Sequence, residues 1–401
     1  MKSLPSVEEA RARMLAAVSA LQSEAIPLTQ ARGRILAQDV TSWRDQPPFA
    51  ASAMDGYAVR NADLPATLTL IGESHAGAGF KGAVGPGQCV RILTGAPLPD
   101  GADRVVIQED VERDGDAIRA PAPEGGDNIR PRGVDFKADQ LLVPKGSRID
   151  AVALALAAAT GAAELAVMRK PRVAVFATGD ELAQLGATPG PDQIFDSGGP
   201  GITALCESWG ANAFNVRAAE DDVDVIAQAA RDAMENADIL VVIGGASVGD
   251  RDLAKPAFQK LGLELLVDKV AVRPGKPVWF GKTTQGLVLG LPGNPASGLV
   301  CAHLFLRPVL NAMRGMPPGP PMQRARLRSA VAANGPREHY LRSGFELDAQ
   351  GQAWATPFEA QDSSLLSVFS KAKCLVRLMP KAEAMAEGDL AEILPLDRDF
   401  G

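Results

Sequence analysis

Three short apolar runs in the middle of the chain predict the strands of a buried sheet. They are 173–177 (VAVFA), 239–243 (ILVVI) and 287–289 (LVL), and helical segments that include 203–209 and 223–236 separate them. Strands that are apolar at every position are buried on both faces, which is typical of a parallel sheet covered by helices. The pattern therefore predicts a central α/β domain.

Shorter and more broken patterns lie on either side of this domain. In 47–140, Gly and Pro recur between apolar runs such as 89–93 and 104–107, which predicts an all-β region with tight turns. The proline-rich linker 314–321 cannot continue a helix or enter a central strand. After this linker, residues 322–401 predict a small β domain.

Two helices are predicted outside the α/β domain. Ser6 and Glu9 have the spacing of a capping box that opens an amphipathic helix, so we expect no signal peptide. The most apolar segment, 151–167, is capped by Asp150 and is expected to end at Gly161 as a buried helix. It is too short and too interrupted to span a bilayer, so we expect no membrane association.

The composition narrows the class of protein. A length of 401 residues predicts two or three domains, and a net charge of −7 argues against a general nucleic-acid binder. The four cysteines and three histidines are scattered without a CxxC pair, which argues against a zinc site and a disulfide framework. Scattered thiols fit a reducing compartment, so we expect a cytoplasmic protein.

Three loops follow the predicted strands, at the edge where open α/β sheets bind ligands. They are 178–182 (TGDEL), 244–252 (GGASVGDRD) and 291–297 (LPGNPAS). The Gly-rich loop lets backbone N–H groups approach the phosphate of an anionic ligand, although a plain tight turn is equally compatible. Glu181 and Asp252 could be helix caps, but two carboxylates beside a phosphate suit a bridging divalent cation.

Two proline-stiffened segments complete the candidate site in this half of the chain. Pro292 and Pro295 make their loop rigid, either as a strand-to-helix corner or as a preorganised wall of the ligand site. Arg273 and Lys276 lie on the turn RPGKP. This turn is either a solvated basic corner or a clamp in which both cations converge on one oxyanion.

Three polar residues near glycine stand out in the N-terminal half of the chain. They are Asp55 in SAMDGYAV, Thr94 in TGAP and Asp135 in RPRGVD. Asp and Thr beside Gly are common turn chemistry, so each residue alone is compatible with a purely structural role.

Taken together, these motifs resemble one family, the molybdopterin molybdenumtransferases of the MoeA type, which are related to the E domain of gephyrin. The motifs are SAMDGYAV, TGAP, RPRGVD, TGDEL, GGASVGDRD, RPGKP and GLPGNPAS. They occur in the family's order over nearly the whole chain, and the first and last are long enough to be highly specific. The C-terminal region resembles the family through Arg337, Arg342 and the segment 363–367.

The resemblance implies a multi-domain α/β plus β fold with a central parallel-sheet domain. The four implied domains are an elongated domain from 1–46 and 141–170, an inserted β domain at 47–140, an α/β molybdopterin-binding domain at 171–315, and a C-terminal β barrel at 322–401. The resemblance also implies a homodimer in which the inserted domain of one chain closes the α/β site of the other.

The implied activity inserts molybdate into adenylylated molybdopterin and releases AMP, with help from a divalent cation, usually Mg²⁺. The implied catalytic residues are Asp55, Thr94, Asp135, Glu181, Asp221 and Asp252, of which Glu181 and Asp252 would hold the metal. The implied substrate-binding residues are Gly244, Gly245, Ser247, Gly249, Pro292, Asn294 and Pro295, and the implied molybdate-binding residues are Arg273, Lys276, Arg337 and Ser363. Molybdopterin adenylyltransferase and apo-molybdoenzymes are the implied protein partners.

The chain departs from the family pattern at two places. Segment 196–198 reads Asp-Ser-Gly where the family often has Asp-Ser-Asn, and Arg273 stands where the family often has Lys. Which member of the pair Asp221 and Asp222 acts is left open.

Two alternatives to this enzyme are a non-catalytic dimeric scaffold of the gephyrin E-domain type and a molybdopterin adenylyltransferase. The intact acidic set argues against the scaffold. The SAMDGYAV region and the C-terminal barrel argue against the adenylyltransferase.

Overall fold

The computed structural model describes residues 4–179, 181–217, 222–244, 253–319 and 322–396. The chain forms two compact units. The first unit consists of Met1–Glu24, Gly33–Ile35 and Ala166–Gly401, and the second consists of Ala25–Arg32 and Leu36–Leu165. The finer division into four domains stays a prediction.

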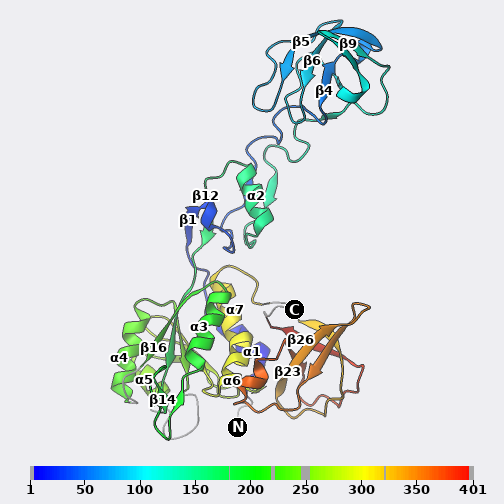
Figure 1. Cartoon of the computed structure of the whole chain (residues 1–401). Helices are drawn as coiled ribbons and strands as arrows, with labels where there is room; N and C mark the ends of the chain where they lie inside the picture. The colour runs from blue at the N-terminus through cyan, green and yellow to red at the C-terminus, as the bar shows by residue number, and fades with distance from the viewer. Residues whose placement is uncertain (1–3, 180, 218–221, 245–252, 320–321, 397–401) are drawn as a thin grey trace. The chain divides into compact units, whose positions relative to one another are not determined.

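A six-stranded sheet forms the centre of the first unit (Figure 1). Its order is β16 (Asn212–Arg217), β13 (Arg172–Ala177), β17 (Ile239–Ile243), β21 (Leu287–Leu291), β20 (Trp279–Lys282) and β18 (Glu264–Val267). The first four strands are parallel, whereas β20 and β18 are antiparallel to their neighbours. The predicted parallel sheet is confirmed, with two antiparallel strands added at one side.

Helices cover both faces of this sheet, and the alternation of side chains along β13 explains how. Val173 and Val175 belong to one buried cluster, and Ala174 and Phe176 belong to another, because successive side chains point to opposite faces. The first cluster is completed by α1 (Val7–Ala16), α3 (Gly198–Ser208), α6 (Pro295–Cys301) and α7 (Arg307–Met313). The second is completed by α4 (Val223–Met234) and α5 (Ala254–Lys260).

The most apolar long helix lies in the core of the first unit. Helices α6 and α7 are joined by the π-helical segment η4 (Ala302–Leu306), so that one helical run extends over Pro295–Met313. This run is long and apolar enough to cross a membrane, but 89% of its most apolar window is buried inside the protein, which is also the property of a core helix. Its N-terminal residue, Pro295, follows the rigid loop predicted at the candidate site.

The C-terminal part of the first unit is a closed barrel. Strands β23 (Glu338–Leu347), β24 (Ala353–Pro357), β22 (Gln323–Leu327), β26 (Leu390–Pro395) and β25 (Cys374–Leu378) pair in that order, and β25 pairs back with β23. The short strand β19 (Val272–Arg273) adds to β23, and α8 (Leu366–Phe369) lies between β24 and β25 in the chain. The predicted C-terminal β barrel is confirmed.

A second six-stranded sheet, this one of mixed direction, dominates the second unit. Its order is β7 (Arg104–Ile107), β4 (Gly56–Val59), β6 (Gln88–Ile92), β5 (Ala66–Ser74), β9 (Ala117–Ala120) and β8 (Glu112–Asp114). Two-stranded pairs add β3 (Ala51–Ser52) with β10 (Ile129–Arg130), and β2 (Val40–Thr41) with β11 (Leu141–Val143). The all-β region predicted from the Gly and Pro pattern is confirmed.

The structure confirms the predicted N-terminal caps of the two helices outside the α/β domain, but not the predicted burial of the second helix. At α1 the capping box is present, with Ser6 accepting from the Glu9 backbone and Glu9 accepting from the Ser6 backbone. Asp150 also caps α2 (Ala151–Ala159), as predicted, by accepting a hydrogen bond from the Ala153 backbone. The prediction that α2 is buried is wrong, because Ala157 is its only buried residue although every residue of the helix is apolar.

Candidate functional site

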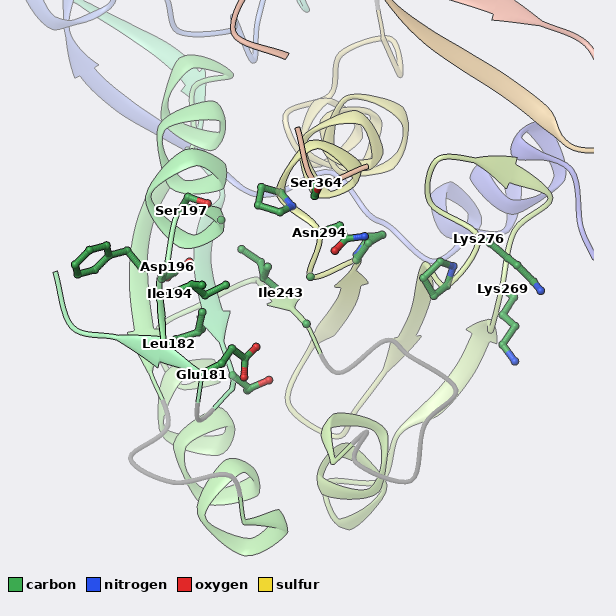
Figure 2. A pocket seen from close by; sticks show the side chains of 18 residues that line it. Glu181, Leu182, Ile194, Asp196, Ser197, Ile243, Lys269, Lys276, Asn294 and Ser364 are labelled. Carbon is green, nitrogen blue, oxygen red and sulfur yellow. The ribbon is translucent and has the colours of Figure 1, made fainter. Parts of the chain in front are cut away.

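A cavity of about 710 Å³ lies in the first unit, where the parallel strands end (Figure 2). That volume is typical of a site for a drug-sized or cofactor-sized ligand. The described residues that line it come from the strand ends, the loops after them and one segment of the barrel. They are Thr178, Glu181, Leu182, Ile194, Phe195, Asp196, Ser197, Gly198, Ile243, Gly244, Lys269, Lys276, Pro277, Pro292, Gly293, Asn294, Pro295 and Ser364.

The register of the sheet explains why three distant loops meet at this cavity. Ala177 pairs with Ile243, and Ile243 pairs with Leu291, so β13, β17 and β21 end at the same level. The next residue of each chain segment therefore lies on the cavity wall, as the loops after parallel strands do in open α/β sheets. The first residues of the three loops singled out in the sequence, Thr178, Gly244 and Pro292 after the strand ends, are thus brought together.

Two glycines allow the loops after β17 and β21 to touch. Gly244 has φ +88°, a conformation that residues with a Cβ rarely adopt. A Cβ on Gly293 would stand 3.3 Å from the Gly244 Cα, tighter than ordinary contact. The backbones of the two loops are therefore in direct contact at this point, and neither glycine places a side chain in the cavity.

The Glu181 carboxylate lies close to a third glycine. A Cβ on Gly179, whose φ is +142°, would meet the Glu181 carboxylate in its present position, so glycine leaves room for the carboxylate there. The Glu181 carbonyl accepts a hydrogen bond of 2.7 Å from the Ile194 N–H, which fixes the backbone. The exposed carboxylate lies at the cavity, available to a ligand or a cation.

The segment Asp196-Ser197-Gly198 also lines the cavity, beside the start of α3. Asp196 accepts a hydrogen bond of 2.8 Å from the Gly199 N–H and so holds the first turn of that helix. A Cβ on Gly198 would stand 3.0 Å from Ile243 Cγ2. The glycine that departs from the family pattern therefore lets the start of α3 pack closely against Ile243, which is 6% exposed.

The proline-bracketed loop connects the α/β part of the cavity to the barrel. Asn294 donates a hydrogen bond of 2.8 Å from its amide to the Ser363 hydroxyl. Ser297 donates its backbone N–H to the Ser363 carbonyl at 3.3 Å. These bonds keep Ser363 at the edge of the cavity, and its neighbour Ser364 lies in the lining.

The two cations of the RPGKP turn line different cavities. Lys276 lines the first cavity together with Lys269, and both lie toward the same side in Figure 2. Arg273 lines a second cavity of about 440 Å³ in the barrel. The convergence of Arg273 and Lys276 on one anion, which the sequence suggested, stays a prediction.

The surroundings of the second cavity are rich in positive charge. Burial, assisted by the charges of Arg273, Arg337 and Arg342, lowers the pKa of His339 to about 4, so this histidine is neutral at pH 7. Arg337 reaches the Val272 carbonyl at 3.4 Å and lines neither cavity.

Arg342 is the more unusual residue of this group. It is 1% exposed, and its Nη2 has no hydrogen-bond partner among the described residues. Its Nε donates to Gln361 at 3.2 Å, and its Nη1 donates to the Leu365 carbonyl at 3.3 Å. Both partners flank Ser363 and Ser364 in the chain, so an unsatisfied cationic donor lies beside the segment that reaches the first cavity.

The second unit contains the remaining described candidates. Asp55 accepts two hydrogen bonds of 2.7 Å from Thr94, one from its backbone N–H and one from its hydroxyl. These bonds, more than the nearby charge of Arg91, hold the pKa of Asp55 below its ordinary value. Asp135 is exposed, and its backbone N–H donates to the Gln46 carbonyl at 3.0 Å. Asp55 and Thr94 therefore form one polar pair, and Asp135 lies elsewhere on the same unit.

Several predicted site residues lie outside the described residues. They are Asp221, Gly245, Ser247, Gly249 and Asp252. Their neighbour Asp222 is described, and its side chain caps α4 by accepting from the backbone of Asp224 and Val225. Asp222 thus has a structural role as the N-cap of α4.

Sequence reasoning did not single out Lys269, and it named Arg342 only for the family resemblance and gave it no role in the site. Lys269 lies in the mostly apolar stretch before β19, and only the fold places it beside Lys276. Arg342 lies within a strand of the barrel, and the structural signal that marks it is an unpartnered buried donor.

Three family models match the chain in succession. They are the MoeA N-terminal region (domain I and II) at residues 5–161, the probable molybdopterin binding domain at residues 174–312, and the MoeA C-terminal region (domain IV) at residues 324–396.

Full-length relatives agree with these matches. The chain is 33% identical to a molybdopterin molybdenumtransferase of Haemophilus influenzae, over 99% of this chain and 100% of the relative. It is 35% identical to one from Nostoc sp., over 84% of this chain and 81% of the relative. The crystal structure of a molybdopterin biosynthesis MoeA protein from Pyrococcus horikoshii is also similar, with a TM-score of 0.85 and 31% identity, covering 98% of this chain and 99% of that chain.

Proposed function

Because the chain belongs to the MoeA family of molybdopterin molybdenumtransferases, a transferase family of molybdenum cofactor biosynthesis, we propose that its cavity inserts molybdate into adenylylated molybdopterin and releases AMP. The observation that carries the proposal is one cavity in which the ends of three parallel strands, with their glycine backbone and the carboxylate of Glu181, meet Lys269 and Lys276 from the segments that flank β19. A phosphorylated anionic substrate requires such a set.

The proposed reaction balances without an added oxidant or reductant. Hydrolysis of the phosphoanhydride breaks its P–O bond, consumes one water and releases AMP. Condensation of molybdate with the two dithiolene thiols forms two Mo–S bonds, and one molybdate oxygen leaves with the two thiol protons as water. Molybdenum stays in the same oxidation state, so the protein must chiefly bind, orient and neutralise charge.

The residues of the cavity fit a hard divalent cation such as Mg²⁺. Among the described lining residues, Glu181 and Asp196 offer carboxylates, Thr178 and Ser197 offer hydroxyls, and none is His or Cys. Oxygen donors are the ligands that Mg²⁺ prefers, and this ion usually keeps substrate phosphates in its shell. No group of three or more His, Cys, Asp or Glu forms within the described residues, so phosphate oxygens and Asp252 would complete the set. When bound, the cation would neutralise phosphate charge.

We further propose that molybdate approaches the cavity from the side of the barrel. Lys276 and Lys269 line the cavity there, and Ser363 is bonded to its wall. Arg273, Arg337 and Arg342 lie near His339 of the barrel, and the unpartnered Nη2 of Arg342 offers a charge-assisted donor. A group of cations that lies near one edge of a cavity raises the local concentration of a dianion.

Turnover by the isolated protein tests this function. Wild-type protein mixed with adenylylated molybdopterin, molybdate and Mg²⁺ is expected to release AMP, measured by chromatography, and to require molybdate for it. Molybdate-independent formation of adenylylated molybdopterin from ATP would instead identify an adenylyltransferase. A protein that binds the substrate and never releases AMP would be a scaffold.

A homodimer is the proposed assembly, and the second unit supplies the support. Helix α2 is apolar throughout but has one buried residue, and its Val152 is 67% exposed. Trp43 is 69% exposed although its indole N–H is bonded to the Thr160 carbonyl, just after α2. Exposed apolar surface of this kind marks interfaces between proteins. In the proposed dimer, the Asp55–Thr94 pair of one chain acts at the cavity of the other.

Mixing two inactive variants tests this shared site. Asp55→Ala and Glu181→Gln chains are each expected to be inactive. After subunit exchange, hybrid dimers carry one site with both wild-type residues, so activity should return to about a quarter of the wild-type value, by the statistics of random pairing. Exchange is verified with two fluorescent labels. No recovery after verified exchange would place Asp55 and Glu181 of one chain in one site.

The two alternatives are not favoured by the comparisons. Full-length relatives carry the name molybdopterin molybdenumtransferase, and the MoeA N-terminal and C-terminal regions flank the molybdopterin-binding domain. We propose cytoplasmic residence, which four free, buried cysteines support, and transient contact with molybdopterin adenylyltransferase and apo-molybdoenzymes, which would supply the substrate and accept the product.

A further inference from the structure

The second cavity, of about 440 Å³, lies at one end of the C-terminal barrel, which is orange to red in Figure 1. Its lining comes from the start of β23, the ends of β24 and β25, and the segment after β22. Because β23 is antiparallel to β24 and β25, and β22 is parallel to β24, these parts of the four strands lie at the same end of the barrel. The mouths of β-barrels are common positions of small-molecule sites.

The apolar walls of this cavity continue the interior of the barrel. Leu341 and Leu378 line the cavity and belong to the buried cluster of the barrel, and Val331 packs against that cluster. Phe358 adds an aromatic side chain to the lining. A ligand with an apolar body would therefore gain free energy here by leaving water.

His339 is a buried polar residue among these apolar side chains. It pairs directly with Leu378 and precedes Leu341 by two residues on β23, so the three side chains lie on the same face of the sheet. His339 is only 9% exposed, and its imidazole has no hydrogen-bond partner among the described residues. The neutral ring offers one N–H donor and one acceptor nitrogen. Leaving these groups unpaired costs free energy, which a polar ligand group in the cavity would recover.

Arg273 gives the cavity a cationic wall. In the parallel register of β19 and β23, Arg273 pairs with His339, which explains why the guanidinium lies at the barrel. Arg273 is exposed and forms no hydrogen bond or ion pair with the described residues. Arg337 and Arg342 add positive charge around His339. The exposed carboxylate of Glu359, which also lines the cavity, offsets part of this charge and so favours a monoanion over a dianion.

We propose that the second cavity binds a small organic monocarboxylate with a compact apolar body. Its carboxylate accepts hydrogen bonds from the Arg273 guanidinium and the His339 N–H, and its body packs against Leu341 and Phe358. A tetrahedral inorganic oxyanion would fill only a small part of the cavity and would leave the apolar walls without contact. The inference is independent of the proposed function, because the two cavities share no lining residue.

Titration of the full-length protein with simple carboxylates tests the proposal. The probes are benzoate, phenylacetate and cyclohexanecarboxylate, each compared by calorimetry with its uncharged amide and with molybdate and phosphate. At least one carboxylate is expected to bind, and its amide should bind at least about tenfold more weakly, because a hydrogen bond to a charged group contributes at least that factor.

Two variants examine the polar contacts separately. Arg273→Leu removes the cation from an exposed position, and His339→Phe removes the buried donor and keeps a ring; each should weaken the carboxylate about tenfold. Arg273→Leu should leave the affinity of the amide unchanged. Melting temperatures verify that the variants fold, and Arg273→Leu alone still tests the proposal if His339→Phe does not fold.

Two further variants are controls for these substitutions. His75→Phe changes an exposed histidine of the second unit that lines neither cavity, so it should leave every affinity unchanged. Lys276→Ala removes a cation of the first cavity and should also leave carboxylate affinity unchanged.

Four results would overturn the proposal. Wild-type protein that binds none of the three carboxylates has no such site, and equal affinity for carboxylate and amide removes the ionic contact. Unchanged carboxylate affinity in Arg273→Leu places the ligand elsewhere, and weaker carboxylate binding in Lys276→Ala places it in the first cavity. AMP release by the wild type is measured separately, so failure here leaves the proposed function untouched.

Discussion

Glu181→Gln is expected to lower the rate of AMP release by more than about a hundredfold and to leave the melting temperature nearly unchanged. The substitution keeps the size of the side chain and removes its charge, and losing one preorganised electrostatic contact costs on the order of 10²–10³ in rate. The carboxylate is exposed and follows a strand end, and its hydrogen bond to Ile194 uses the backbone, so the fold loses little. Single-turnover AMP release and calorimetric melting measure the two quantities.

Glu207→Gln provides the control for this experiment. Glu207 is an exposed glutamate of α3 that does not line the cavity, so its neutralisation should affect neither rate nor stability. The sequence also predicts that Asp252→Asn abolishes AMP release. Near-wild-type turnover by Glu181→Gln would remove this residue from the metal and phosphate roles.

Lys276→Ala is expected to raise the molybdate concentration needed for half-maximal turnover by about two orders of magnitude. Lys276 lies on a turn stiffened by Pro274 and Pro277, so little entropy is lost when its ammonium group holds an anion. Removing such a donor costs on the order of 2–4 kcal/mol, and each 1.4 kcal/mol is a factor of about ten. Binding of adenylylated molybdopterin should change much less, because its phosphates are assigned to the loop that begins at Gly244.

Lys282→Ala is the matched control, because Lys282 is an exposed lysine at the end of β20 that does not line the cavity. The Arg273→Ala variant distinguishes a role of the second cavity in molybdate binding from a role of the first, because Arg273 lines the second cavity. An unchanged molybdate dependence in Lys276→Ala would remove this lysine from molybdate binding. Equal weakening of molybdate and substrate would instead assign it to the phosphates.

The meeting of the three loops could be predicted from the sequence because one physical rule governs it. Fully apolar strands imply a parallel sheet, and parallel strands that end in register bring the following loops to one edge. The pairs Ala177 with Ile243 and Ile243 with Leu291 show that this happened here. The β structure of the inserted region was predictable because short apolar runs between turn residues indicate strands, whereas the closed barrel at the C-terminus was implied only by the family resemblance.

Side-chain direction could not be predicted in the same way. The spacing of Arg273 and Lys276 suggests one clamp, but the turn between them sends the two side chains to different cavities. The prediction that α2 is buried was wrong. An apolar helix is expected to be covered by other residues, but its composition does not show whether those residues belong to the same chain. Lys269 and Arg342 were missed because their importance arises from residues distant in sequence.

The two walls of the cavity should differ greatly in amide hydrogen exchange. One wall begins at Pro295, the first residue of the helical run through the core, and residues of that run such as Val300 and Leu310 are fully buried. The opposite wall rests on the two-residue ladder of β14 (Leu182–Ala183) and β15 (Ile194–Phe195). Amides of the helical run should exchange only through global unfolding, whereas those of the ladder should exchange through local opening. The protein thus meets its ligand with one fixed surface and one that can adjust to it.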